Sequence, residues 1–145
     1  MNKWYLCKVA YERQADEMGM KKVTESYLVD ALSFTEAEER VIKEVTPFVS
    51  VGELEVVNIR PMRLAELLLD GSSDKYYRAK VDLITIDSKG QERKASTGML
   101  VQANSLLVAT KELMLHLDGL PPYELVSIGE LDILDVYQYV APPAE

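Results

Sequence analysis

The sequence predicts an α+β fold: a tandem duplication of a ββαββ unit with an approximate internal twofold, in which antiparallel strands combine with two main helices. One observation is that the chain aligns with itself after a shift of 72 positions, so that residues 3–9 fall on 75–81 and residues 22–45 fall on 94–117 without a gap. The other is that strand-like alternation precedes a helix-like spacing of apolar residues in both copies. A duplicated fold explains both patterns most simply.

Two strands are expected at the start of each copy. In the first copy, residues 4–11 and 22–29 are rich in aromatic and branched side chains. In the second copy, residues 76–86 and 94–101 flank Asp-Ser-Lys-Gly at positions 87–90, a composition typical of a tight turn. Each pair of strands therefore predicts a β-hairpin.

A helix is predicted after each hairpin. Ser33 can accept a hydrogen bond from a backbone amide of the first helical turn, with Glu36 three residues later, and Pro47 discourages continuation of the helix. The second copy has Ser105 at the position of Ser33, and Gly119 is expected to close its helix. The apolar residues that match at three- and four-residue steps are Phe34, Ala37, Val41 and Val45 in the first copy and Leu106, Ala109, Leu113 and Leu117 in the second.

A third and a fourth strand are expected after each helix. There the offset between the copies shrinks to 69 positions, which matches residues 54–59 with 123–128 and residues 64–68 with 133–137. Helix propensity alone favours a helix over residues 63–69. Their partner segment has the branched and aromatic content of a strand, so the repeat predicts a strand at both places.

We expect a single domain over residues 1–145, built of repeat unit 1–70 and repeat unit 75–139 joined by a short connector. A chain of this length can remove about two thirds of its unfolded surface from water, so its core needs no disulfide or metal. Residues 140–145 are rich in proline and alanine and are expected to form a flexible tail.

The composition favours a cytoplasmic protein that does not enter a membrane. The single cysteine, Cys7, cannot form an internal disulfide, and no stretch approaches the roughly 20 apolar residues of a membrane span. The net charge of −8 argues against general attraction to polyanions. Residues 1–25 and 75–98 together nevertheless carry eleven Lys and Arg against seven Asp and Glu, so a locally basic surface can exist on this acidic chain.

The chain also resembles a known family over nearly its whole length. The resemblance is carried by Trp-Tyr-Leu-Cys-Lys-Val at residues 4–9, by residues 22–31 and 34–38, and by Tyr-Tyr-Arg-Ala-Lys-Val at residues 76–81. In these stretches the chain resembles an uncharacterised domain-of-unknown-function family, family 4494, from Bacteroidetes and some of their phages. The resemblance implies one small protein, and it implies no activity and no functional residues.

Alternation divides the first strand of each copy into a core face and an opposite face. The expected core residues are Tyr5, Cys7, Val9 and Tyr11 in the first copy and Tyr77, Ala79, Val81 and Leu83 in the second. On the opposite face an aromatic ring and a cation recur in both copies, and cations of the neighbouring strands lie on the same side. The candidate ligand or partner surface consists of Trp4, Lys8, Lys22, Tyr76, Arg78, Lys80 and Lys94.

This surface predicts a non-enzymatic binding or assembly module. A protein partner, or a second copy in a homodimer, is the first interpretation. The alternative is single-stranded nucleic acid, because bases stack on aromatic rings while Lys and Arg contact phosphates. A plain solvated sheet face, with lysine stems covering the rings, is also consistent with the pattern.

The chain offers little for catalysis, and we expect no catalytic residues, no metal and no cofactor. The acids Glu55 and Glu124, like Glu66 and Asp135, occupy equivalent places in the two copies. A metal-dependent enzyme that uses these duplicated carboxylates is therefore the third functional hypothesis. His116, the only histidine, is expected to interact with the negative end of its helix.

The second predicted helix differs from the first on its outer side. It carries apolar residues beyond its core stripe, at Leu107, Val108, Met114 and Leu115, where the first helix is mostly charged. Apolar residues around a helix indicate burial on more than one face. We expect this helix to pack in the domain junction or against a second chain, with an isologous dimer as the simplest symmetric solution.

Overall fold

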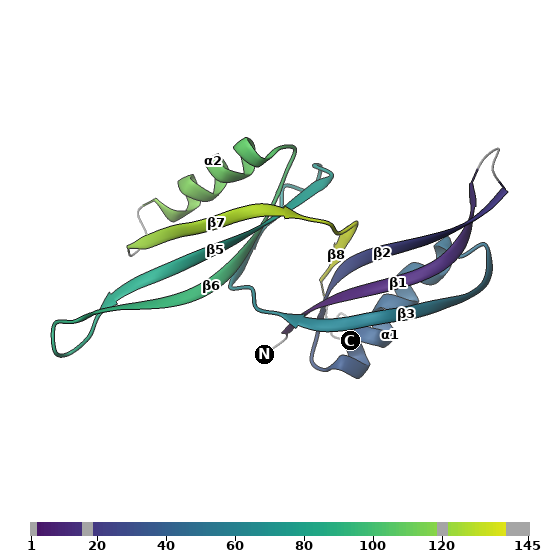
Figure 1. The fold of residues 1–145 in the computed structure, drawn as a ribbon, viewed down its shortest axis with the longest axis horizontal. Coiled ribbons are helices and arrows are strands. Elements are labelled where there is room, and N and C mark those ends of the chain that lie inside the picture. The colour runs from purple at the N-terminus through teal and green to yellow at the C-terminus, as the bar shows by residue number, and fades with distance from the viewer. Residues whose placement is uncertain (1–2, 16–18, 119–121, 139–145) are drawn as a thin grey trace, which may run out of the picture. The chain divides into compact units, whose positions relative to one another are not determined.

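Two four-stranded sheets and two α-helices make up the part of the chain that the structure, a computed structural model, describes (Figure 1). The described residues are 3–15, 19–118 and 122–138. The predicted α+β class is confirmed. Residues 16–18, between the two predicted strands of the first hairpin, lie outside the described residues, as do the helix-closing Gly119 and the tail at 140–145. Within them, neither α-helix has the length and hydrophobicity that crossing a membrane requires.

The chain divides into two units. Unit 1 comprises Met1–Met62 together with Ile133–Glu145, and unit 2 comprises Arg63–Asp132. The elements of unit 1 are β1 (Lys3–Ala15), β2 (Gly19–Ala31), α1 (Phe34–Val45), the 3-10 helix η2 (Thr46–Phe48), β3 (Val51–Met62) and β8 (Asp135–Tyr137). The elements of unit 2 are β4 (Glu66–Leu68), β5 (Lys75–Ile86), β6 (Glu92–Ala103), α2 (Leu106–Leu117) and β7 (Tyr123–Leu131).

The long strands of each unit form an antiparallel sheet in the same order. In unit 1 the order is β3-β1-β2, and in unit 2 it is β7-β5-β6. The predicted turn at residues 87–90 joins β5 to β6, and the Asp87 amide donates to the Gln91 carbonyl oxygen at 2.9 Å. Gly90 has a φ of 78°, a conformation that glycine adopts without steric cost.

The short strands β4 and β8 correct the predicted arrangement. Strands near residues 64–68 and 133–137 were predicted, and they are present. However, β4 follows β3 in the chain but joins the sheet of unit 2, and β8 follows β7 but joins the sheet of unit 1. Each pairs in parallel, β4 with β6 and β8 with β2, so the sheets are not wholly antiparallel. The physical reason is that the third long strand occupies one edge of each sheet, and the short strand covers the remaining edge.

Each helix begins at its predicted cap and covers one face of the sheet in its own unit. The Ser33 side chain accepts from the Glu36 amide at 3.2 Å, and the Ser105 side chain accepts from the Val108 amide at 3.2 Å. These caps satisfy backbone donors that would lack a partner at a helix start. The chain continues past α1 through Pro47 in η2, so this proline ends the α-helix without ending helical winding.

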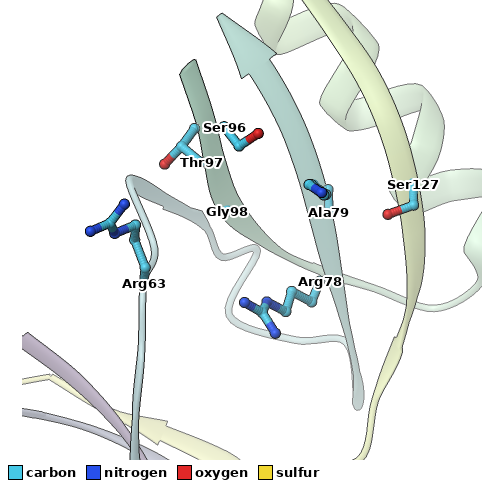
Figure 2. Close-up of a pocket in the computed structure, with 8 residues that line it drawn as sticks. Arg63, Arg78, Ala79, Ser96, Thr97, Gly98 and Ser127 are labelled. Atoms are coloured by element: carbon cyan, nitrogen blue, oxygen red, sulfur yellow. The ribbon is translucent and has the colours of Figure 1, made fainter. Parts of the chain in front are cut away.

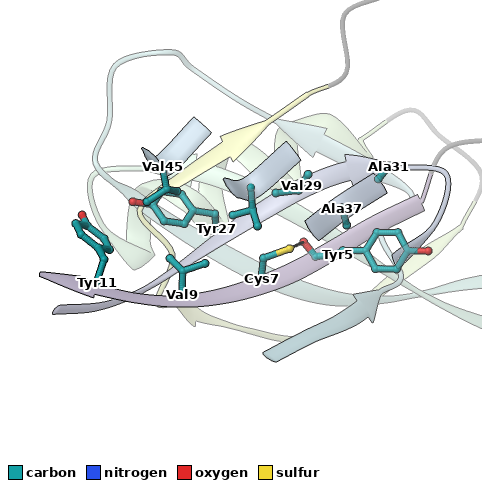
Figure 3. Close-up of a cluster of buried hydrophobic side chains, with 10 residues drawn as sticks. Tyr5, Cys7, Val9, Tyr11, Tyr27, Val29, Ala31, Ala37 and Val45 are labelled. Carbon is teal, nitrogen blue, oxygen red and sulfur yellow. Dashed lines mark hydrogen bonds between the residues drawn. The ribbon is translucent and has the colours of Figure 1, made fainter. Parts of the chain in front are cut away.

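A separate core lies beneath each helix (Figure 3 for unit 1). The first core holds all four predicted residues of β1, together with the helix residues Ala37, Val41 and Val45. The second holds three of the four predicted residues of β5, and Leu83 is the exception, being only half-buried. The first residues of the predicted helix stripes, Phe34 and Leu106, are 52% and 47% exposed, because each lies in the first turn at the margin of its core.

Candidate functional site

The predicted surface residues separate into several environments. Lys8 and Lys22 are exposed and Trp4 is half-buried in unit 1, whereas the other four lie in unit 2. Tyr76 is only 5% exposed, and Gln102 Nε2 lies 3.4 Å from its hydroxyl. The expectation that Tyr76 presents its ring on a surface is therefore corrected: neither aromatic member is a fully exposed ring.

Two of the predicted cations, Arg78 and Lys80, line one pocket of about 480 Å³ in unit 2 (Figure 2). They project from the face of β5 that points away from α2, because the alternate residues of this strand belong to the helix-side core. Lys80 pairs across the sheet with Gly98 on β6 and with Ser127 on β7. The remaining polar lining comes from Ser96, Thr97 and Arg63.

Arg63 reaches this pocket because the chain crosses the sheet at Gly98. The Ala65 amide donates to the Gly98 carbonyl oxygen at 2.7 Å, which fixes the segment that leads into β4. A Cβ added at Gly98 would lie 2.6 Å from the carbonyl oxygen of Arg63, so only glycine leaves room for the crossing. The sequence analysis did not identify Arg63 as part of this site. The signal available in the sequence was that the second copy has glycine at position 98, where the first copy has Ser26, because glycine allows another backbone segment to approach closely.

The pocket is cationic and partly supplied with hydroxyl groups. Among the described residues, no ion pair or side-chain hydrogen bond involves Arg63, Arg78 or Lys80. Guanidinium groups without a partner can bind carboxylate or phosphate oxygens in a bidentate manner. One acid lies beside the site: Asp82 accepts a 2.6 Å hydrogen bond from the hydroxyl of the lining residue Ser96.

Lys94, the last predicted cation, is engaged elsewhere. Its Nζ lies 3.0 Å from Glu124 Oε2, and both side chains are 52% exposed. Glu124 was a predicted member of a duplicated acid pair, and in the structure it balances a lysine instead.

The other predicted acids are also dispersed. Glu66 contacts the ring nitrogen Nε2 of His116, so the histidine in the last turn of α2 has a carboxylate partner that was not foreseen. Asp135 lies in unit 1, as does the exposed Glu55. Among the described residues, no group of three or more His, Cys, Asp or Glu side chains is arranged to hold a metal ion.

A second pocket, of about 190 Å³, lies in unit 1 and was not predicted. Glu25 lines this pocket, and its Oε2 accepts from the hydroxyls of Tyr11 at 2.9 Å and Tyr27 at 2.7 Å. The ring of Tyr27 stacks on that of Tyr137 with centroids 5.3 Å apart and planes inclined by 17°. Figure 3 shows Tyr11 and Tyr27 together at one end of the core.

The environment of this second pocket is negative. Burial, followed by the charges of Asp135, Glu44 and Glu25, raises the pKa of Tyr137 to about 12. Burial and the hydrogen bond to Glu25 also raise the pKa of Tyr27. Sequence reasoning placed Tyr11 in the core without noticing its polar partner.

The thiol of Cys7, in contrast, is a packing group. It is fully buried beneath α1, and burial raises its pKa to about 12. A thiol with such a pKa contains almost no thiolate at neutral pH, which removes it from consideration as a nucleophile.

The outer side of α2 carries several exposed apolar side chains. Leu107 is 64% exposed and Leu115 is 71% exposed, and they lie eight residues apart on the helix. Leu106, Val108 and Met114 are also exposed, at 47%, 43% and 51%. Beneath the end of the helix, Met114 and Leu115 border a groove of about 670 Å³.

Comparisons with known proteins extend the family resemblance and add no function. Neither the curated proteins nor the solved structures yielded a match to the chain. One family model matches residues 3–139, which is nearly the whole chain. The chain belongs to the family described as domain of unknown function DUF4494.

Proposed function

We propose that the chain is a non-enzymatic binding module that holds an anionic segment of a protein partner on the strand face of unit 2. The observation that carries this proposal is the pocket in which Arg63, Arg78 and Lys80 lie together without an acidic partner among the described residues. The three side chains are exposed around one pocket, so the carboxylates of one anionic segment can contact several of them at once, and hydrogen bonds between charged groups are stronger than neutral ones. The proposal includes a cytoplasmic location, where the single buried cysteine stays a thiol.

Carboxylates of a protein partner fit this pocket better than single-stranded nucleic acid. Binding of single strands relies on exposed rings on which bases stack. Tyr76 is buried, and no aromatic ring is among the described residues that line the pocket. The net charge of −8 also repels a polyanion at long range, whereas a short acidic segment needs only local cations.

We propose in addition that the two units arose by tandem duplication of a ββαββ unit with an approximate twofold relationship. Two details support this. The register of β1 with β3 shifts between Lys8 and Val9, and that of β5 with β7 shifts between Lys80 and Val81, again 72 positions apart. Likewise β4 pairs with Met99 to Val101, and β8 pairs with the matching residues Tyr27 to Val29.

The copies have diverged at the pocket. Leu6 stands at the position that matches Arg78, and Asp132 stands at the position that matches Arg63. The cationic site is thus a property of unit 2 alone, which is typical of a duplicated scaffold in which one copy acquired a binding role.

The test is fluorescence anisotropy with a labelled oligoglutamate peptide and a labelled oligothymidylate of equal charge. We expect the peptide to bind, and the variant Arg78→Gln/Lys80→Gln to weaken binding by about tenfold or more, since charged hydrogen bonds contribute about 1.5–3 kcal/mol each. The matched control is Lys89→Gln/Lys111→Gln, which removes the same charge from exposed positions outside the pocket.

Two outcomes contradict the proposal. Equal loss of affinity in the control variant would mean that only net charge matters. Tighter binding of the oligothymidylate, with steep dependence on salt, would support the nucleic-acid hypothesis instead.

Self-association through α2 is the second candidate function. The specific observation is the exposure of Leu107 and Leu115 on a helix whose counterpart α1 is charged on its outer side. Apolar patches of this kind commonly mark interaction sites. A second copy presents the same apolar stripe, so an isologous pairing of two α2 helices buries both at once.

A further inference from the structure

We propose that the tyrosine-lined pocket of unit 1 binds an organic ammonium group, either a small methylated amine or a modified lysine side chain. This pocket belongs to a different unit from the cationic site, so the inference stands independently of the proposed function. Its lining includes four aromatic rings and two carboxylates, those of Tyr11, Tyr27, Phe48, Tyr137, Glu25 and Asp135.

Glu25 is incompletely paired in this pocket. Its side chain is only 11% exposed, and its Oε2 already accepts from two tyrosine hydroxyls. The other oxygen, Oε1, faces Arg13 Nη1 at 3.6 Å, which is beyond the 2.7–2.9 Å of a charge-assisted hydrogen bond. Arg13 is itself 50% exposed, so a ligand cation can take its place beside Oε1 while Arg13 turns toward solvent.

The groups around Glu25 make the electrostatic potential of the pocket negative. Asp135 lines the same pocket, and its Oδ1 accepts from the Val136 amide at 2.8 Å. The charges of Asp135, Glu44 and Glu25 all raise the pKa of Tyr137, which indicates a negative electrostatic potential at that ring. Among the described residues that line the pocket, Arg13 is the one cation, and its 3.6 Å contact with Glu25 is weak.

The aromatic lining and the size of the pocket match an organic ammonium group. Aromatic faces attract cations, and quaternary or methylated ammonium groups are held well because their methyl groups also contact apolar rings. The volume of about 190 Å³ exceeds the space of a few water molecules but is below the roughly 300 Å³ at which pockets hold drug-sized ligands. A small ammonium head fits this range, whereas a nucleotide or a large cofactor does not.

Unit 2 has neither the tyrosines nor the glutamate at the positions that match this pocket. Leu83, Thr97, Met99 and Leu68 stand where unit 1 has Tyr11, Glu25, Tyr27 and Tyr137. Met99 is 2% exposed, and Leu68 packs against the core of unit 2. Unit 2 is therefore completed by small or apolar residues at these positions, whereas in unit 1 Tyr11 and Tyr27 belong to the core and in addition donate their hydroxyls to Glu25.

The experiment is a titration of the full chain with tetramethylammonium chloride, followed by amide chemical shifts, with sodium chloride at equal ionic strength as reference. We expect saturable shifts for the amides of Tyr27, Leu134 and Tyr137 that sodium chloride does not produce. The double variant Glu25→Thr/Tyr137→Leu introduces the residue types found at the matching positions of unit 2. It should weaken tetramethylammonium binding at least tenfold without unfolding the protein. A peptide that carries trimethyl-lysine tests in parallel whether the ligand is a protein side chain.

One variant separates this site from a purely structural cluster. Arg13→Gln removes the competitor for Glu25 Oε1, so we expect tetramethylammonium to bind several times more tightly to it than to the wild-type chain. The matched control for Tyr137→Leu is Tyr123→Leu, which removes a half-buried tyrosine from unit 2 and should leave the affinity for tetramethylammonium unchanged. Shifts that fail to saturate, or equal affinity in the wild type and in Glu25→Thr/Tyr137→Leu, would overturn the proposal.

Discussion

The carbonyl oxygen of Arg63 lies 2.6 Å from the point at which a side chain on Gly98 would begin. This close approach lets the chain cross the sheet of unit 2 and bring Arg63 to the cationic pocket before β4 pairs with β6. In unit 1 the corresponding hydrogen bond, from the Leu134 amide to the Ser26 carbonyl oxygen, is 2.9 Å long and accommodates a serine. The tight crossing is therefore specific to the unit that carries the cations.

Gly98→Ala should destabilise unit 2 and weaken binding at the cationic pocket. The added Cβ meets backbone and not the end of a flexible side chain, so the segment before β4 must shift and strain its 2.7 Å hydrogen bond from Ala65. Overpacking of this kind costs about 1–3 kcal/mol. Urea unfolding followed by circular dichroism measures the change in the free energy of unfolding.

Gly129→Ala is the matched control for this prediction. Gly129 lies on β7 in the same unit, and a Cβ added there meets nothing within 4 Å. Its free energy of unfolding should stay within about 0.5 kcal/mol of the wild type, as for most surface substitutions. If both variants lose the same stability, the crossing at Gly98 is not the cause.

The sequence predicted the elements well because the two copies inform each other. Residues 63–69 favour a helix by propensity, yet Glu66–Leu68 within them form β4, as the matching segment with branched residues indicated. The helix starts at Ser33 and Ser105 follow from local cap chemistry, which depends on a few neighbouring residues only.

What could not be predicted depends on which strand edge a segment joins. Alternation identifies the faces of a strand but says nothing about its neighbours, so the pairing of β4 with β6 and of β8 with β2 was missed. For the same reason Arg63 was not assigned to the pocket of Arg78. The burial of Tyr76 likewise depends on three-dimensional packing that the period of a strand does not encode.

Asp87 should make stability depend on acid pH. Its carboxylate accepts from the Gln91 and Lys89 amides at 2.9 Å and from Arg93 Nε at 3.0 Å. The hydrogen bond from Gln91, supported by those from Arg93 and Lys89, holds the pKa of Asp87 below its usual value. A carboxylate with a lowered pKa stabilises the fold above about pH 4, and this stabilisation is lost as the pH falls through the lowered value.

We therefore expect Asp87→Asn to lower the thermal midpoint at pH 7 and to approach the wild-type midpoint near pH 3. Differential scanning calorimetry at the two pH values measures both differences. Asp74→Asn serves as the comparison, because Asp74 is exposed and makes no hydrogen bond or ion pair among the described residues. If the difference in thermal midpoint between Asp87→Asn and the wild type is the same at pH 3 as at pH 7, the ionised Asp87 carboxylate does not stabilise the turn.

The exposed stripe of α2 should hold two copies together. Leu107 and Leu115 are separated by about 12 Å along the helix, with Lys111 between them, so two antiparallel α2 helices can place the start of one stripe against the end of the other. We expect light scattering to give twice the 16.3 kDa of the chain, and Leu107→Glu/Leu115→Glu to give the single mass with unchanged circular dichroism.

The control, Val57→Glu/Val126→Glu, adds the same charge at apolar positions that are 49% and 48% exposed on β3 and β7, and it should remain dimeric. Neither pair of substitutions lies in a core, so both variants should fold. If the wild-type chain is monomeric, or if both variants lose the dimer, then the apolar side of α2 does not mediate self-association.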